Sequence, residues 1–427
     1  MRFKSIQFSV AALAGASVLA VVAALVLYSM YSGSRTQAMV EDNTRNLLEQ
    51  MIKDRLITLG QAQVSQIQRE LEYPLAIAGN LAQVNALMGE TDSQGNALIG
   101  TNREELSNML RNAVVKNPKL LDAYIGWEPN AFDQDDDLYA GQTENAYDES
   151  GRFMPWWYRK ADGTPTVEPL GAEMTSEKLL PTGVRAGEYY LCTRETKGIC
   201  IIDPAPYEMG GKMVMMASFN VPILVNGQFR GVVGADLALD FIQTLLIKAN
   251  AELYQGAGEM ALISTNGRLV ALTQDAGKLG EPSTQVLNNL GNLQHLRPNQ
   301  PDFSIDEASG QIQLIMPFTI ANTATQWTLV MRLPQQAVYT DLIKLQGDLR
   351  SQYETDIAGM TLVGLIIAGI GLLVIWFVGY GIARPLRQMV GMLDDIAKGD
   401  GDLTKRLTVD RVDELGQIAN GFNTFLN

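Results

Sequence analysis

Two uninterrupted apolar runs divide the chain into a short N-terminal segment (1–8), a long central part and a C-terminal part. The runs cover residues 9–29 and 357–382, and neither contains a charged side chain. About 20 apolar residues are needed to cross the hydrocarbon core of a bilayer. Both runs therefore predict transmembrane helices.

Charged residues beside these runs predict their orientation. Arg2 and Lys4 precede the first run, and Arg384 and Arg387 follow the second. Because positive charge favours the cytoplasmic side, both chain ends are expected in the cytoplasm and residues 30–356 outside it. A cleaved signal peptide is the alternative for the first run, although that run is longer than a typical signal core.

Helical spacing continues after the first run. Apolar residues recur every three or four positions from Leu47 to Leu71, and Pro74 is expected to end the pattern. We therefore predict one long helix over residues 30–74. At 1.5 Å per residue it would span roughly 60 Å, enough for two stacked modules.

Beyond Pro74 the pattern changes to short apolar runs separated by Gly, Pro, Asn and Asp. Helical stretches lie between them, around 103–115 and 239–253. A sheet built from hairpins with helices packed on it is an α+β arrangement. The runs predict strands at 123–127, 213–220, 229–236, 259–264, 268–273, 311–318 and 327–333.

A tight hairpin divides this region into two modules. Asn266-Gly267 stands between two of the predicted strands, where such a pair favours a two-residue turn. We take it as the start of a smaller, membrane-proximal module. The expected boundaries are a distal module at 75–253, a proximal module at 254–340 and a connecting helix at 341–356.

The C-terminal residues 383–427 carry two narrow apolar stripes at helical spacing. Pro385 is expected to open the first helix, residues 399–407 to form a connector, and Glu414 and Gly416 to start the second helix. Two such helices cannot bury their stripes alone, whereas two copies can form a four-helix bundle. A homodimer is therefore predicted, with an ordinary amphipathic hairpin as the alternative.

This C-terminal segment resembles the HAMP relay of bacterial receptors, and the whole order of elements resembles that of methyl-accepting chemotaxis proteins with a double Cache sensor. The resemblance implies two stacked PAS-like Cache modules on a long helix, placed between two transmembrane helices and followed by a HAMP helical bundle. It also implies an inner-membrane receptor with a periplasmic sensor. A cytoplasmic helical hairpin beyond residue 427 would contact a chemotaxis kinase and its adaptor.

Composition narrows the function classes. The formal charge of -14 argues against nucleic acid as a partner, because phosphate binding needs clustered Lys and Arg. An enzyme would normally show a Ser, His and Asp set or a cluster of metal ligands, and His295 is the only histidine. We expect no catalytic residue and no cofactor. A sensor kinase or cyclase with the same input domain, or a membrane-anchored enzyme using paired carboxylates, is an alternative.

Two cysteines, Cys192 and Cys200, lie eight positions apart in the exterior part. In an oxidising compartment such a pair favours one disulfide that closes a short loop. Metal binding is the weaker alternative, since zinc would need two further ligands.

The resemblance also implies a ligand site in the distal module. In the amino-acid-sensing branch of the family, an Arg two residues before a Trp-Tyr pair binds the ligand carboxylate, while a Tyr and an Asp bind its ammonium group. Aligned on Pro155, Met154 stands at the Arg position. The corresponding positions here are Trp156 and Trp157 for the aromatic pair, Tyr207 for the tyrosine and Asp236 for the acid.

The methionine changes the expected ligand. A carboxylate that leaves water needs hydrogen-bond donors, and a thioether supplies none. Aromatic rings and carboxylates suit a cation instead, so a small amine or polyamine is the first expectation. Arg152, two residues earlier, keeps an amino acid or organic acid as the alternative.

Each candidate also has a purely structural interpretation. Trp156, Trp157 and Tyr158 fit core or lid packing, and Tyr124 fits a core strand. Asp236 fits either a ligand contact or the cap of the next helix, and Asp203 a turn more than a ligand contact. The acidic loop at 133–144 has partial calcium-hand spacing, but Leu138 replaces the expected Gly, which favours a solvated loop.

Overall fold

A computed structural model describes residues 6–96, 98–160, 162–287, 290, 293, 296–306, 308–398, 406–407 and 412–425. The chain forms two units. One comprises residues 1–48 with 341–427, and the other comprises residues 49–340. Most of the predicted 399–407 connector and His295 lie outside the described residues.

Helix α1 (Ile6–Met88) is longer than predicted, because it continues through Pro74 instead of ending there. An interior proline costs about 3 kcal/mol, since it removes one backbone hydrogen bond and crowds the preceding turn. Apolar burial on both sides offsets this cost. Leu71, Leu75 and Ala78 are all buried in a core cluster that contains residues of both sheets.

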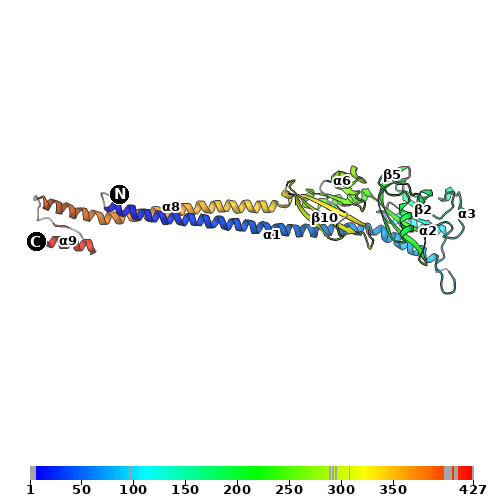
Figure 1. The fold of residues 1–427 in the computed structure, drawn as a ribbon, viewed down its shortest axis with the longest axis horizontal. Helices are drawn as coiled ribbons and strands as arrows, with labels where there is room; N and C mark the ends of the chain where they lie inside the picture. The colour runs from blue at the N-terminus through cyan, green and yellow to red at the C-terminus, as the bar shows by residue number, and fades with distance from the viewer. Residues whose placement is uncertain are drawn as a thin grey trace. The chain divides into compact units, whose positions relative to one another are not determined.

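The distal module is a six-stranded antiparallel sheet in the order β3-β2-β1-β6-β5-β4. Helix α1 and helix α2 (Arg103–Lys116) lie against one face, and helix α4 (Glu188–Thr196) covers part of the other (Figure 1). The strands are β1 (Asp122–Trp127), β2 (Pro155–Arg159), β3 (Pro165–Pro169), β4 (Cys200–Met209), β5 (Lys212–Val225) and β6 (Gln228–Ala238). The predictions for β1, β5, β6 and α2 are confirmed.

Strands β2, β3 and β4 were not predicted, and all three contain proline. Strands β3 and β4 are the two edges of the sheet, where a missing backbone donor is tolerated. In β4 the pairing register shifts between Ile202 and Ala205, next to Pro204. The prolines therefore explain why a pattern-based prediction missed these strands, although the strands form in the fold.

The proximal module is a five-stranded antiparallel sheet in the order β8-β7-β11-β10-β9. The hairpin at Asn266-Gly267 is confirmed, with Gly267 at a φ of 75° that favours glycine. Helix α5 (Leu239–Ala251) follows β6 directly and packs on β7 and β8. The strands are β7 (Glu259–Ile263), β8 (Leu269–Leu272), β9 (Asp302–Asp306), β10 (Gln311–Thr319) and β11 (Gln326–Pro334). Short helical elements complete both modules: α3 (Asp136–Tyr139), η1 (Thr143–Asn145), η2 (Ala172–Thr175), η3 (Tyr254–Gly256), η4 (Ala276–Lys278), α6 (Ser283–Val286) and α7 (Gln335–Val338).

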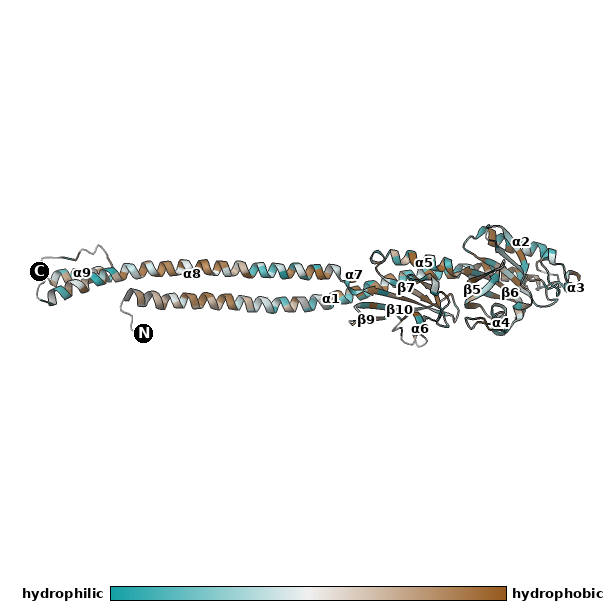
Figure 2. Ribbon diagram, turned by 90° about the horizontal axis from the view of Figure 1, so that it is seen from above, coloured by the Kyte–Doolittle hydropathy of each residue, from teal (hydrophilic) through white to brown (hydrophobic). Residues whose placement is uncertain are grey.

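Helices α1 and α8 (Thr340–Ala397) each carry a stretch long and apolar enough to cross a membrane. Figure 2 shows these stretches as hydrophobic runs on the two helices. Within their unit the helices approach closely at glycines. A Cβ on Gly15 would lie 2.8 Å from Leu372, and one on Gly364 would lie 3.2 Å from Val26.

Pro385 does not open a helix, as the sequence suggested, because it lies inside the continuous helix α8. The predicted connecting helix, second transmembrane helix and first HAMP helix are thus one element. Helix α9 (Glu414–Phe425) begins as expected at Glu414, and Asp413 Oδ1 accepts a hydrogen bond from the Gly416 amide at 3.2 Å. Met389, Leu407 and Ala419 form its small buried cluster with α8.

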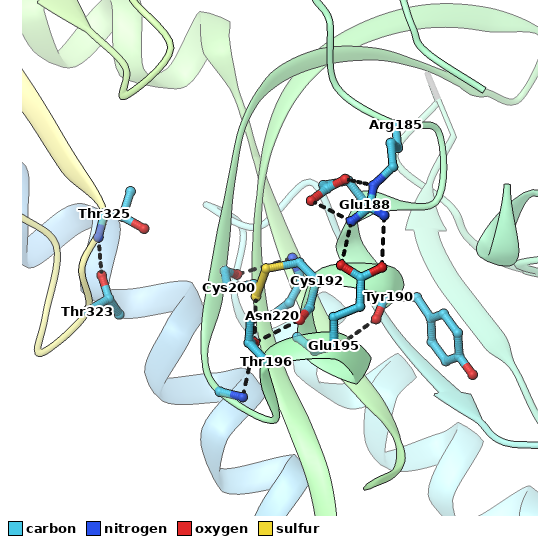
Figure 3. Close-up of a disulfide and its surroundings, with 12 residues drawn as sticks. Arg185, Glu188, Tyr190, Cys192, Glu195, Thr196, Cys200, Asn220, Thr323 and Thr325 are labelled. Atoms are coloured by element: carbon cyan, nitrogen blue, oxygen red, sulfur yellow. Dashed lines mark hydrogen bonds and ion pairs between the residues drawn. A yellow bond between two sulfur atoms is a disulfide. The ribbon is translucent and has the colours of Figure 1, made fainter. Parts of the chain in front are cut away.

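The predicted disulfide is present. Cys192, in the middle of α4, and Cys200, at the start of β4, have Cα atoms 6.2 Å apart (Figure 3). Beside them Arg185 forms ion pairs with Glu188 and Glu195. The disulfide therefore fixes the middle of α4 to the edge strand of the distal sheet.

Replacing both cysteines with serine should lower the free energy of unfolding by about 2–3 kcal/mol, because the short closed loop no longer restricts the unfolded chain. We expect the melting temperature of the chain in nanodiscs to fall by roughly 5–10 °C. Reductant should lower the melting temperature of the unmodified chain and leave the double variant unchanged. Equal melting of both proteins would contradict this role.

Candidate functional site

A cavity of about 70 Å³ lies on the α4 side of the distal sheet. Since about 10–15 Å³ of such space holds one water, it has room for a molecule of a few non-hydrogen atoms. None of its described lining residues is Arg or Lys. The lining comprises Tyr124, Trp156, Leu170, Glu173, Ala186, Tyr189, Tyr207, Glu208, Met216, Ser218 and Asp236.

The alternation of side chains along β1 and β2 decides which candidates reach this cavity. On β1, Tyr124 faces the cavity, whereas Ala123 and Ile125 belong to the core cluster on the α1 side. On β2, Trp156 lines the cavity, while Trp157 points to the opposite face and donates its indole N–H to Ser107 Oγ of α2 at 2.8 Å. The structure thus separates the predicted aromatic pair.

Two buried carboxyl groups meet where β1 and β6 pair. Asp122 lies directly opposite Asp236, and Asp236 lies opposite Ser218 of β5. Asp122 is 0% exposed and Asp236 is 4% exposed. Both oxygens of Asp122 and Oδ1 of Asp236 have no hydrogen-bond partner among the described residues. Asp236 does not cap the next helix, because Ala238 occupies the N-cap of α5.

Burial favours the protonated form of both groups. Desolvation raises the pKa of Asp122 to about 7, and the neighbouring Trp156 side chain offsets a part of this rise. Desolvation and then the charge of Asp122 raise the pKa of Asp236 well above its ordinary value. Two like charges this close disfavour joint ionisation, so the pair retains protons that an exposed aspartate would lose.

Tyrosines enclose the carboxyl pair. The Tyr124 hydroxyl donates to Asn220 Oδ1 at 2.6 Å, and its ring packs edge-on against Tyr189 with centroids 5.3 Å apart. The Tyr207 hydroxyl is buried without a hydrogen-bond partner among the described residues. Burial raises the pKa of Tyr189 and of Tyr207, so both hydroxyls keep their protons at neutral pH. They can donate to a ligand or to a carboxylate.

A glycine makes room for the Tyr124 ring. Gly234 of β6 pairs with Tyr124, and a Cβ at this position would lie 2.2 Å from Tyr124 Cζ. Real Cβ atoms do not approach other atoms this closely. The position of the ring over the sheet therefore depends on the missing side chain.

The remaining predicted site residues lie elsewhere. Tyr158 is buried below Trp156 and donates to Glu168 Oε1 at 2.5 Å. Arg152 donates from Nη2 to the Trp127 carbonyl at 2.7 Å and stacks over Tyr190.

Asp203 is neither a turn residue nor a cavity residue, because it lies within β4. Its Oδ2 accepts the Asn266 amide of the proximal hairpin at 2.6 Å. It therefore joins the two modules.

Sequence reasoning missed several lining residues and the buried neighbour Asp122. Asp122 stands two positions before Tyr124, so the period of a strand would have placed it on the same face. Ser218 was recognisable only from the pairing of β5 with β6, which places it opposite Asp236. Glu173, Glu208 and Tyr189 come from the 3-10 helix η2, an edge strand and a short helix, where no periodic signal was available.

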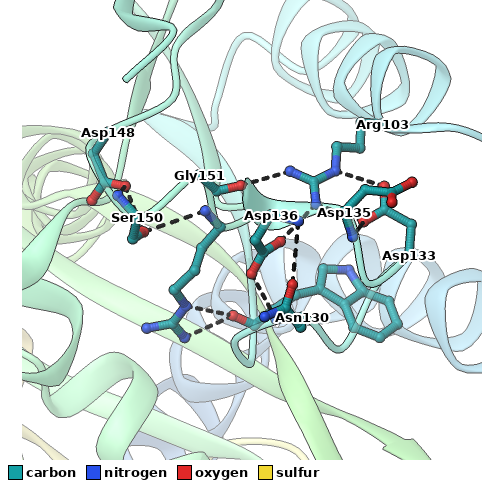
Figure 4. Close-up of polar contacts among 10 residues, drawn as sticks. Arg103, Asn130, Asp133, Asp135, Asp136, Asp148, Ser150 and Gly151 are labelled. Carbon is teal, nitrogen blue, oxygen red and sulfur yellow. Dashed lines mark hydrogen bonds and ion pairs between the residues drawn. The ribbon is translucent and has the colours of Figure 1, made fainter. Parts of the chain in front are cut away.

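The acidic loop at 133–144, which was considered as a calcium site, is paired with a cation of the chain itself, the side chain of Arg103 on α2 (Figure 4). Arg103 is 3% exposed, and its guanidinium forms ion pairs of 2.6 Å with both Asp133 and Asp136. It also donates to the Gly151 carbonyl at 2.7 Å. Its Cζ lies 4.1 Å from the centre of the Tyr139 ring. No group of three or more metal-binding side chains occurs within the described part of the chain.

Two regions of the chain match known protein families. Residues 377–427 match the HAMP domain family. Residues 106–244 match the family described as methyl-accepting chemotaxis protein-like, first PDC sensor domain. The first match contains α9 and the end of α8, and the second contains every described residue that lines the cavity.

One similar protein is the methyl-accepting chemotaxis protein TlpQ of Pseudomonas aeruginosa, which is 30% identical over 430 residues. The alignment covers 100% of this chain and 60% of TlpQ, so the chain spans less than two thirds of that relative. The methyl-accepting chemotaxis protein PctB of the same organism is 25% identical over 99% of this chain and 54% of its own length.

Solved structures share the fold of the sensor. The extracellular domain of the putative histidine kinase mmHK1S-Z2 matches with a TM-score of 0.52 and 22% identity, covering 67% of this chain and 99% of that one. A protein described as methyl-accepting chemotaxis protein X matches with a TM-score of 0.51 and 20% identity, covering 67% and 98%. At this identity the likeness concerns the fold alone.

Replacing Arg103 with Met should destabilise the chain by about 3–5 kcal/mol, because two partly or fully buried carboxylates would lose their cation. Arg111→Met, an exposed position on the same helix, is the matched control and should change stability little. Chelators should leave the melting temperature of the unmodified chain unchanged. A fall in melting temperature with chelator, restored by calcium, would show that the loop needs a metal.

The carboxyl pair predicts how stability depends on pH. Between the ordinary aspartate pKa of 3.8 and about 7, the folded chain binds more protons than the unfolded chain, so the free energy of unfolding should fall as the pH rises. Asp122→Asn should make this fall less steep. Near neutral pH it should raise the free energy of unfolding by on the order of 1 kcal/mol, and the melting temperature by a few degrees. Melting curves in nanodiscs across this range would check it, and identical slopes for both proteins would contradict it.

Proposed function

The chain belongs to the methyl-accepting chemotaxis protein family, with its PDC-type sensor and its HAMP domain, and from this premise we propose that it is a receptor for a small cationic amine. The ligand would bind in the cavity of the distal module. The signal would pass through α8 and the HAMP domain to a cytoplasmic chemotaxis kinase and its adaptor. The receptor would act as a homodimer in the bacterial inner membrane.

A single observation carries the ligand class: the buried carboxyl group of Asp236, one oxygen of which has no hydrogen-bond partner among the described residues, lines a cavity whose described lining contains no Arg or Lys. A carboxylate moved out of water needs a compensating cation or hydrogen bonds. The chain supplies such a cation for Asp133 and Asp136 through Arg103, but not for Asp236. An ammonium group of the ligand would supply it there.

The aromatic lining supports the same ligand class. Tyr124, Trp156 and Tyr189 line the cavity, and each ring attracts a cation by about 0.5–2 kcal/mol. Glu173 and Glu208 are exposed residues of the lining, where their negative charge favours the approach of cations. A ligand carboxylate would meet these acids without a compensating cation among the described lining residues.

Exposed apolar side chains support the homodimer. Val390 and Leu393 of α8 are 65% and 50% exposed, and Ile418 of α9 is 53% exposed. These are positions of the stripes that the sequence assigned to a bundle core. Helices of a second copy would cover them.

We expect the chain in nanodiscs to bind propylamine or 1,4-diaminobutane in calorimetric titrations, and to bind alanine or acetate much more weakly. Asp236→Asn should weaken amine binding by about tenfold or more, since it removes a charge-assisted contact. Trp156→Leu should weaken it by roughly 2- to 30-fold, as expected for one lost cation-π contact.

Matched controls separate these effects from general damage. Asp240→Asn removes an exposed carboxylate four positions from Asp236, and Trp157→Leu removes the indole that faces α2. Both controls should bind amines as the unmodified chain does. Stronger binding of alanine than of propylamine would favour an amino-acid receptor and refute the amine assignment.

A further inference from the structure

We propose that Asp122 and Asp236 together hold one proton in the ligand-free receptor and release it when a cationic ligand binds, so that the site exchanges a proton for a cation. This inference rests on the proposed function, because it concerns the same cavity. It adds a role for Asp122, which the ligand assignment does not need. It also adds a dependence of sensing on external pH.

The pairing of the strands brings the two carboxyl groups together. Residues directly opposite on antiparallel strands have Cβ atoms about 4.5–5.5 Å apart, and Asp122 is directly opposite Asp236. The backbone holds this register at the same point, since the Leu121 amide donates to the Asp236 carbonyl at 2.9 Å. The ladder of β1 and β6 thus holds the two Cβ atoms side by side.

Three oxygens of the pair lack partners. Both oxygens of Asp122 and Oδ1 of Asp236 accept no hydrogen bond among the described residues. Two ionised carboxylates in this position would be desolvated and would repel each other. One shared proton removes one charge and supplies an O–H donor that satisfies an oxygen of the neighbour.

No Arg or Lys is among the described residues that line the cavity, so no cation there replaces that proton. Tyr124 on β1, Trp156 on β2 and Ser218 on β5 are neutral, and their side chains offset only a part of the effect of burial on the pKa of the pair. Tyr189 on α4 and Tyr207 on β4 are also neutral. The acids of the lining are Glu173 from η2 and Glu208 from β4, whereas Glu188 of α4, near Tyr207, forms an ion pair with Arg185. Glu173 and Glu208 favour retention of the proton.

The exchange balances in atoms and charge. Before binding, the pair has one O–H bond and a charge of -1. On binding, that O–H bond breaks, the proton passes to solvent, and the ammonium group keeps its own protons between two ionised carboxylates. The charge of the site stays the same, so the buried region gains no net charge. The free-energy cost of desolvating the site on binding therefore stays low.

The consequence is that acid competes with the ligand. While the pair is protonated, each unit of pH should change the apparent affinity up to about tenfold, because one proton leaves for each bound cation. At pH values where the ligand-free pair has already lost its proton, the apparent affinity for the amine should no longer change with pH. Burial raises the pKa of both carboxyl groups, that of Asp122 to about 7, so this change lies above the usual titration range of an aspartate.

Calorimetry in buffers of different ionisation enthalpy tests the exchange, with propylamine as the probe and the chain in nanodiscs. Near neutral pH we expect about one proton released per bound amine, and less release at about pH 9. Infrared difference spectra should show the carbonyl band of a protonated carboxylic acid disappearing when propylamine is added. The infrared band distinguishes this exchange from loss of a proton by the amine itself.

Asp122→Asn should release fewer protons per bound amine than the unmodified chain does at the same pH, because Asp236 alone can then hold an exchangeable proton and no longer faces the charge of Asp122. Asp240→Asn, with an exposed carboxylate, should behave as the unmodified chain does. Amine binding without proton release or loss of the band would overturn this inference and leave the proposed function standing. Absence of amine binding would overturn both.

Discussion

The antiparallel pairing of β1 with β2 and β6 is the constraint on which the sensor depends. Because successive side chains of a strand face opposite sides, this one register divides the central residues into two sets. Ala123, Ile125 and Trp127 enter the core on the side of α1, whereas Tyr124 lines the cavity and Asp122 lies on the same face of the strand as Tyr124. A shift of one residue would place carboxyl groups in the apolar core and aliphatic side chains in the cavity.

Much of the architecture was predictable from the sequence because it depends on periodic patterns. The apolar runs, the turn at Asn266-Gly267 and the alternation in β1 are repeated local signals, and the structure confirms them. The ends and interruptions of elements were not predictable in this way. Pro74 and Pro385 both lie inside helices, since apolar packing along α1, and continuation of the apolar run along α8, outweigh a local preference.

The site was only partly predictable for a related reason. Trp156, Tyr207 and Asp236 were predicted through the family resemblance, and Asp236 also because it ends an apolar strand; together with Tyr124 they line one cavity. Trp157 was assigned with Trp156, although adjacent strand residues face opposite sides. The partnership of Asp122 with Asp236 links positions far apart in the sequence, and only the pairing of β1 with β6 brings them together.

The space that Gly234 leaves for the Tyr124 ring has an evolutionary consequence. A methyl group added there would collide with the ring, so the shape of the cavity depends on one position that carries no side chain. Under the proposed function, duplicated receptors could diverge toward guests of another size by one such replacement while they retain both acids. Guest size and guest charge would then be selected at separate positions, and each could be inherited and altered without the other.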